Sequence, residues 1–372
     1  MGLSSQVVTY RVNDATTVKL EIEPTEGFHP AKGHRDEVYA VCAVTVDGRA
    51  LLASGGADDR VRLWDPPAGG QLAVLEGHQG SVNAVSAVTV GGRALLASGS
   101  GDRTVRLWDP RTGEQLAVLD GHQGPVRAVC PVTVDGRAML ASGSGDRTVR
   151  LWDPREGGQL AVLEGHHGSV RAVCAITVDG RALLASGGDD DTVRLWDPQD
   201  GGQLAVLDGH QGPVRAVCAV TVDGRALLAS GGDDDRVRLW DPQNGGQLAV
   251  LEGHQDWVDA VCALRVDGRA LLASGGADRT VRLWDPRTGG QLVVLEGHQG
   301  PVRAVCPVTV DGRALLASGC DDDTVRLWDP RTSICLLTAR THHKVLAVAG
   351  VTDALAIGLD IGILVIKPSA VV

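Results

Sequence analysis

A 44-residue repeat constrains this chain more than any other feature of its sequence. The dipeptide Trp-Asp occurs seven times at a constant interval of 44 residues, and Gly-His occurs seven times at the same interval. A unit of this size cannot bury both its faces alone, so neighbouring copies must stack and cover each other. The sequence therefore predicts one repeat architecture for most of the 372 residues.

Within one unit, the apolar residues and turn signals indicate four short strands and no helix. The unit at residues 121–164 reads GHQGPVRAVCPVTVDGRAMLASGSGDRTVRLWDPREGGQLAVLE. Its VRAVCPVTV segment is apolar nearly throughout, as expected of a strand covered on both faces. The Asp-Gly pair that follows is typical of a tight hairpin turn. RAMLASG, TVRLW and QLAVL then form three further strands, separated by a Gly-Asp turn and a loop marked by Pro and Gly.

Four-stranded units with an early Gly-His and a late Trp-Asp resemble the repeats of the WD40 family. The resemblance covers residues 33–340 as seven tandem repeats without a gap. It implies an all-β fold, a β-propeller of four-stranded antiparallel blades in which each blade packs against its neighbours.

The number of blades depends on the two terminal segments. Residues 341–372 hold three strand-like runs without Trp-Asp, and we interpret them as a degenerate eighth repeat and a C-terminal tail. Residues 1–32 contain a hairpin-like stretch, and residues 16–23 within it are the candidate outer strand of the eighth blade. We therefore expect eight blades, closed by the N- and C-terminal strands so that no sheet edge is exposed. Seven blades, with both termini packed outside the ring, is the alternative.

Each repeat contains a His, a Ser and an Asp, the residue types of a nucleophilic triad. The set recurs seven times at identical spacing, whereas an active site needs one asymmetric arrangement, and the Ser lies within an apolar strand rather than in a G-x-S-x-G elbow. The WD40 resemblance implies instead a buried hydrogen-bonded tetrad that also includes the Trp, and we predict no catalytic residue and no enzyme. The predicted tetrads are His34, Ser54, Asp58 and Trp64; His78, Ser98, Asp102 and Trp108; His122, Ser142, Asp146 and Trp152; His166, Ser186, Asp190 and Trp196; His210, Ser230, Asp234 and Trp240; His254, Ser274, Asp278 and Trp284; and His298, Ser318, Asp322 and Trp328.

The remaining candidate ligands do not indicate a metal or a cofactor. No Cys-x-x-Cys or His-x-x-x-His spacing is present, the Asp triplets lack the ligand spacing of a calcium loop, and no glycine-rich phosphate loop occurs. Six of the eight cysteines fill one repeated apolar slot. Because packed sheets lie about 10 Å apart, we expect these six to stay unpaired and buried. Cys320 and Cys335 are unique to one repeat.

Charge and composition limit the classes of partner. The net charge of −11 argues against nucleic acid, which needs clustered basic residues. No apolar run approaches the length of a membrane span, and the first residues do not read as a secretory signal. We therefore expect a monomeric, cytoplasmic protein that binds neither nucleic acid nor membrane. The excess of arginine over lysine, 31 against 4, favours a bacterial source.

The remaining sequence evidence on function comes from positions at which the repeats differ. In the WD40 family, contact positions flank the start of the first strand of each blade and precede the tetrad Asp, on one face of the ring. One repeat alone carries a Trp followed by an acid at these positions, in the segment GHQDWVDAV. The candidate partner-binding residues are Trp257, Asp259, Tyr39, Glu37, Asn83, Arg127, Arg171, Arg215 and Arg303.

These positions support more than one hypothesis. The leading one is a non-catalytic scaffold that binds a protein or peptide through this face and the rim of the central channel, because exposed Trp is enriched at binding hot spots. The alternative is an anion or nucleotide-like ligand held by the rim arginines, although the Asp residues beside them would partly neutralise such a site. An enzyme with its site at the channel mouth, or one module of a protein whose effector domain lies elsewhere, are weaker alternatives.

Overall fold

A computed structural model describes residues 6–13, 16–22, 33–66, 70–310, 312–341, 344–351, 354–359 and 362–366. Its regular elements are all strands. No helix within these ranges is long and apolar enough to span a membrane.

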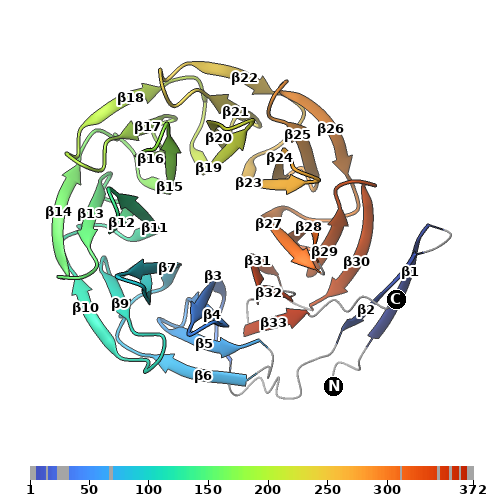
Figure 1. Ribbon diagram of the computed structural model, residues 1–372, viewed down its shortest axis with the longest axis horizontal. Helices are drawn as coiled ribbons and strands as arrows, with labels where there is room; N and C mark the ends of the chain where they lie inside the picture. Colours follow the sequence, from blue (N-terminus) through green and yellow to red (C-terminus); the bar gives the residue numbers. More distant parts are fainter. Residues whose placement is uncertain are drawn as a thin grey trace.

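The seven repeats form seven four-stranded antiparallel sheets, each with its strands paired in chain order. These blades are arranged around one axis, with the first strand of each nearest the axis and the fourth at the periphery (Figure 1). Blades one to four consist of β3(Val38–Val46), β4(Arg49–Gly56), β5(Val61–Asp65) and β6(Gly70–Leu75); β7(Val82–Val90), β8(Arg93–Ser100), β9(Val105–Trp108) and β10(Gln115–Leu119); β11(Val126–Val134), β12(Arg137–Ser144), β13(Val149–Asp153) and β14(Gly158–Leu163); and β15(Val170–Val178), β16(Arg181–Gly188), β17(Val193–Trp196) and β18(Gln203–Leu207). Blades five to seven consist of β19(Val214–Val222), β20(Arg225–Gly232), β21(Val237–Trp240) and β22(Gln247–Leu251); β23(Val258–Val266), β24(Arg269–Gly276), β25(Val281–Asp285) and β26(Gly290–Leu295); and β27(Val302–Val310), β28(Arg313–Cys320), β29(Thr324–Asp329) and β30(Ile334–Arg340).

The Asp-Gly hairpins have the geometry that the sequence predicts. In blade three, Asp135 and Gly136 take φ values of 48° and 79°, so both central residues of the turn are left-handed. This conformation matches the right-handed twist of the strands that the turn joins, and Asp and Gly are residues that adopt it readily. The resulting register pairs Val134 with Arg137 and places the last six residues of the second strand in the interior.

A glycine in the second strand of each blade lets the next blade approach closely. A Cβ atom added at Gly231 would lie 2.6 Å from Cγ1 of Val258, the first residue of the next inner strand. The same pair recurs around the ring at Gly55–Val82, Gly99–Val126, Gly143–Val170, Gly187–Val214, Gly275–Val302 and Gly319–Val345. The hydrophobic core is therefore a series of inter-blade clusters, and each blade contributes to the cluster of its neighbour.

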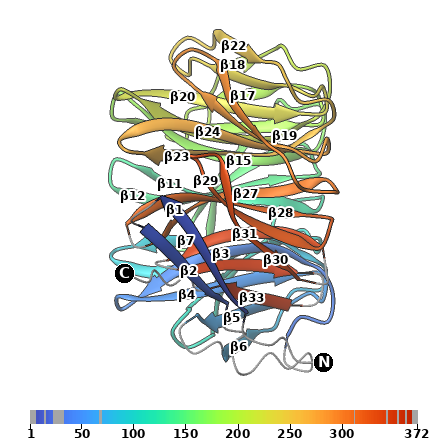
Figure 2. The same ribbon diagram turned by 90° about the vertical axis from the view of Figure 1, so that its right-hand side faces the viewer.

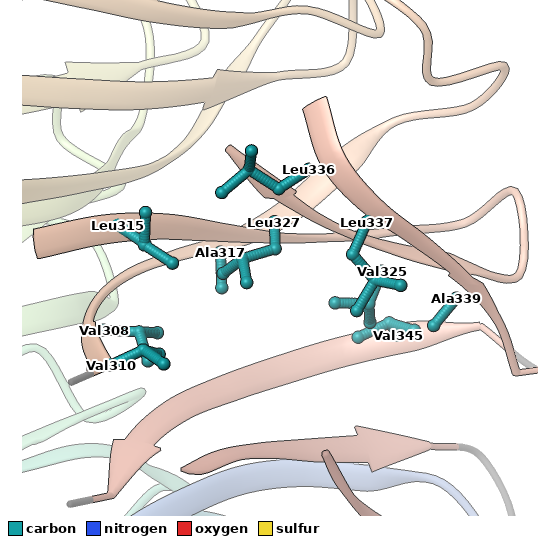
Figure 3. Close-up of a cluster of buried hydrophobic side chains, with 10 residues drawn as sticks. All are labelled: Val308, Val310, Leu315, Ala317, Val325, Leu327, Leu336, Leu337, Ala339 and Val345. Carbon is teal, nitrogen blue, oxygen red and sulfur yellow. The ribbon is translucent and has the colours of Figure 1, made fainter. Parts of the chain in front are cut away.

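The expectation of eight four-stranded blades is wrong, because the seven repeats form the only four-stranded sheets of the described chain. A sheet of three strands, β31(Val345–Val351), β32(Ala354–Leu359) and β33(Gly362–Ile366), follows blade seven. Val345 belongs to the same buried cluster as Val325 and Leu337 of blade seven (Figure 3). Ala349 packs with Trp64 of blade one. The three-stranded sheet thus lies between the last blade and the first, but it lacks a fourth strand.

The predicted closing strand is not paired with this sheet. β2(Thr16–Ile22) forms a two-stranded antiparallel sheet with β1(Gln6–Asn13). This hairpin lies outside the ring in Figure 1, and in Figure 2 it crosses in front of the blades. Closure by a terminal strand is therefore not confirmed, and the N-terminal segment adds a sheet of its own. His342, which we expected as a remnant of an eighth Gly-His, lies outside the described residues.

Candidate functional site at the channel mouth

The four tetrad residues of each repeat come together in every blade. In blade five, Nε1 of Trp240 donates to Oγ of Ser230 over 2.8 Å, and Oγ lies 2.7 Å from Nε2 of His210. Nδ1 of the same histidine lies 2.8 Å from Asp234. The six other blades have the same three contacts. Every Ser, His and Trp of these sets is buried.

One assignment of protons satisfies the whole tetrad. The indole N–H donates to the serine oxygen, the serine O–H donates to Nε2, and Nδ1–H donates to the carboxylate. The histidine is then neutral, and burial lowers the pKa of His34 and His298 below the ordinary value. Burial alone would raise the pKa of Asp322, but hydrogen bonds, first that of the Thr324 hydroxyl, lower it to about 2. A buried network of this kind stabilises a blade only while every partner is present.

Away from the tetrads, one cavity lies on the axis at the start of the inner strands. Its volume is about 410 Å³. It is lined by the second residue of each inner strand, including that of β31, namely Tyr39, Asn83, Arg127, Arg171, Arg215, Asp259, Arg303 and Leu346. Seven of these are predicted contact residues, and the structure brings them together at this channel mouth. Leu346 was missed, because its segment lacks the repeat signature that identified the other positions.

In blades five to seven, two arginines and three aspartates of the rim form one network of ion pairs. Asp259 lies between Arg215, whose Nη1 is 3.3 Å from Oδ1, and Arg303, whose Nη1 is 3.0 Å from Oδ2. Each arginine also binds the Asp of its own blade, Arg215 to Asp233 over 3.0 Å and Arg303 to Asp321 over 2.7 Å. Burial raises the pKa of Asp259, although both arginines oppose that shift. In blade four, Arg171 pairs in the same way with Asp189.

Trp257 is held beside this network. The guanidinium carbon of Arg215 lies 4.6 Å from the centroid of the Trp257 ring, which is the geometry of a cation–π contact. The Trp side chain is nevertheless 45% exposed, whereas the seven tetrad tryptophans are buried. The sequence could not place Arg215 under this ring, because the two residues come from neighbouring blades.

On the other side of the channel mouth, in blades one to three, the rim side chains form fewer ion pairs. Among the described side chains, Arg127 has no hydrogen bond or ion pair, since Gly145 stands where blade four has Asp189. Nδ2 of Asn83 donates to the carbonyl of Val126 over 2.9 Å. The hydroxyl of Tyr39 donates to Glu37, and this Tyr is 37% exposed. The four rim arginines are therefore not equivalent, and among the described side chains only Arg127 has no carboxylate partner.

All eight cysteines are free thiols. For the six in the repeated slot this agrees with the expectation, but the expectation that these six are buried is wrong, because each is partly exposed. Among the described residues, one group could hold a metal ion, namely His298, Cys320 and Asp322. This group was not predicted from the sequence, because it contains no known metal-binding motif. It lies in blade seven, and its signal in the sequence is that Cys320 occupies the position held by Ser100 and Ser144 in blades two and three.

Comparisons with known proteins agree with this architecture. The WD40 family, described as WD domain, G-beta repeat, matches residues 28–65, 69–109, 113–153, 157–197, 201–241, 245–285 and 289–329. No curated protein sequence matches the chain. Among solved structures, the crystal structure of the computationally designed Ika8 protein is similar, with a TM-score of 0.76 and 28% identity over 94% of this chain and 100% of that chain.

Proposed function

Because the chain belongs to the WD40 repeat family, whose members commonly act as interaction scaffolds and are generally not enzymes, we propose that it is a non-catalytic scaffold. Its partner is a protein or peptide that binds over the channel mouth. The observation that carries this proposal is the exposed Trp257, fixed in place by Arg215.

The fixed position of Trp257 favours a binding role over incidental exposure. Arg215 is itself held by Asp233 and Asp259, so the ring stacks on a guanidinium that has little freedom. An aromatic side chain ordered before binding loses little conformational entropy when a partner covers it. Tyr39, which lines the cavity, supplies a second exposed aromatic ring, whereas Trp257 lies beside the cavity on Arg215.

A second observation concerns the chemistry of the partner. Arg127 offers five donors, and Gly145 brings no competing carboxylate to it. An acidic side chain of the partner would satisfy Arg127, and the same chemistry applies to a small anion. Anion binding therefore remains a second candidate function, but it rests on Arg127 rather than on four converging arginines.

The proposal is tested with peptides selected on the immobilised protein from a random display library. Trp257→Ser is a matched variant, because Ser81 and Ser169 occupy this position in blades two and four. We expect the selected peptides to bind it about 10- to 30-fold more weakly than wild type, as for a hot-spot residue. Arg127→Asn, which copies Asn83 of blade two, should weaken only those peptides that carry an acid.

Leu204→Ser on the outer strand β18 is the control, since Leu204 is 45% exposed at the periphery. Its affinities should equal those of wild type. Selected peptides that bind Trp257→Ser and Arg127→Asn as tightly as wild type would contradict a partner site at the channel mouth.

A further inference from the structure

Blade seven departs from the other blades at one buried group of side chains. His298 precedes β27, Cys320 ends β28, and Asp322 lies in the turn before β29. Their ligand atoms all lie within 4.8 Å of one another. Thiol, imidazole and carboxylate together are the donor set that zinc and related divalent ions prefer.

The thiol replaces a hydroxyl in a preformed position. In blade three, Oγ of Ser144 donates to the carbonyl of Gly124 over 2.8 Å and accepts from the amide of Asp146 over 3.2 Å. Sγ of Cys320 makes the same two contacts, with Gly300 over 3.0 Å and Asp322 over 3.3 Å. The backbone around Cys320 is thus unchanged, and the substitution puts a soft ligand atom beside a tetrad histidine and aspartate.

A second substitution in the same blade removes a competing cation from the carboxylate. In five blades, the strand-three Arg forms an ion pair with the tetrad Asp, as Arg238 does with Asp234 over 3.0 Å. In six blades that Arg also binds a Gln of the fourth strand.

Blade seven has Cys335 in place of this Gln, and its arginine, Arg326, turns away. Arg326 donates to the carbonyl of Gly297 over 2.9 Å and lies 3.9 Å from the sulfur of Cys335. Within the described side chains it forms no ion pair with Asp322. The carboxylate is therefore available to a different cation.

We propose that blade seven binds one zinc-like divalent ion through Nδ1 of His298, Sγ of Cys320 and a carboxylate oxygen of Asp322. Nδ1 of His298 lies 3.3 and 3.1 Å from the two carboxylate oxygens of Asp322. The histidine and the aspartate of the tetrad are farther apart here than in the six other blades. The two distances match the edge of about 3.3 Å between nitrogen and oxygen ligands of a tetrahedral zinc ion. A dication, a thiolate and a carboxylate sum to zero charge, as a buried site requires.

Binding exchanges protons without any oxidation or reduction. The S–H bond of Cys320 breaks, its proton goes to solvent, and a metal–sulfur bond forms. The imidazole keeps one proton, which moves from Nδ1 to Nε2, and Nε2–H then donates to Oγ of Ser318, 2.8 Å away, while the hydroxyl hydrogen of Ser318 turns away from Nε2. Ser318 still accepts from Trp328, so the tetrad continues to hold the ring of His298 as an outer partner of the metal.

The test is a titration of the full chain with Cd²⁺, followed by the ultraviolet absorption of the cadmium–thiolate bond. Wild type should develop this band up to one equivalent, and Zn²⁺ should displace it. Cys320→Ser should show no band while remaining folded, because blades two and three already contain Ser at this position.

Cys335→Gln restores the Gln that binds this Arg in the six other blades, five of which also pair the Arg with the tetrad Asp, and so tests the role of Arg326. It should keep the band but bind Cd²⁺ about 10-fold more weakly, since Arg326 is drawn back toward the carboxylate. A wild type without a band, a band unchanged in Cys320→Ser, or a band that is lost in Cys335→Gln would each overturn the proposed site.

Discussion

At the scale of single residues, the serine hydroxyl is the atom on which each tetrad depends. In blade five, Ser230 is fully buried and contacts both Trp240 and His210, so its removal would leave the indole N–H and Nε2 of the imidazole without partners. Each unsatisfied buried group costs about 1–3 kcal/mol. The sevenfold repetition of this geometry supports a structural role for the His, Ser and Asp of the repeats.

Acidification should therefore destabilise the protein. The tetrad Asp carboxyls have pKa values below the ordinary 3.8, because their hydrogen bonds outweigh the effect of burial. A carboxyl whose pKa is lowered by folding contributes stability that is complete above the unfolded pKa and is lost as the pH falls through the folded one. For Asp322 this window runs from 3.8 to about 2. The lowered pKa values of His34 and His298 act in the same direction below 6.5.

The midpoint of urea unfolding, measured between pH 7 and pH 2, tests this sign. It should fall below pH 4, and it should fall less steeply in Asp322→Asn, which has no carboxyl to titrate at that site. A midpoint that stays constant or rises on acidification in wild type would show that the carboxylates do not stabilise the fold.

The cysteines of the inner strands add a contact between neighbouring blades. The sulfur of Cys306 accepts the amide of Gly350 over 3.2 Å, which ties blade seven to β31. Burial raises the pKa of the Cys42 and Cys130 thiols, and a backbone amide of the next blade, that of Ala87 and that of Ala175, opposes the rise. Cys262 has no such partner, because Pro307 provides no N–H. Comparison of the repeats could reveal these positions, but not that the sulfur meets the following blade.

At the scale of elements, the close fit between blades depends on the second-strand glycines. Gly231→Ala places a methyl group against Val258 and should lower the free energy of unfolding by about 1–3 kcal/mol, as overpacked sites do. Gly158→Ala is the control, since Gly158 has a negative φ and nothing within 4 Å of the added Cβ. It should change stability by less than about 1 kcal/mol. Equal effects of both substitutions in chemical denaturation would contradict the packing described for the blades.

The strands themselves could be predicted closely from the sequence, and the channel-mouth contacts could not. The Asp-Gly turns and short apolar runs are local signals, so each repeat indicated its own four strands. Arg215 contacts Asp259 and Trp257, which belong to the next blade. These contacts form only because the ring places the rim residues of neighbouring blades side by side. Such contacts follow from the assembled ring and not from any single repeat.

At the scale of the whole molecule, the ring joins its ends through a sheet that lacks the repeat signature. Periodicity predicted seven units, but it carried no information on the strands outside residues 33–340, where the eight-blade expectation failed. The inner strand β31 nevertheless packs as an eighth inner strand, because Val345 meets Gly319 in the way that Val302 meets Gly275.

If the three-stranded sheet is an integral part of the ring, Val345→Ala and Val302→Ala should be equally costly. Both valines are fully buried, and each loss should be about 1–3 kcal/mol in thermal or chemical unfolding. A costly Val302→Ala beside a neutral Val345→Ala would show that the sheet does not contribute to the packed ring in solution.

The central claim, that a partner covers the channel mouth at Trp257, is tested most directly by iodide quenching of tryptophan fluorescence. Trp257 is the exposed one of the eight tryptophans, so it provides the fraction of emission that iodide can quench, and Trp257→Ser should abolish that fraction. We predict that a saturating selected peptide protects this fraction in wild type. Quenching that is unchanged when the peptide is bound would contradict the proposed site.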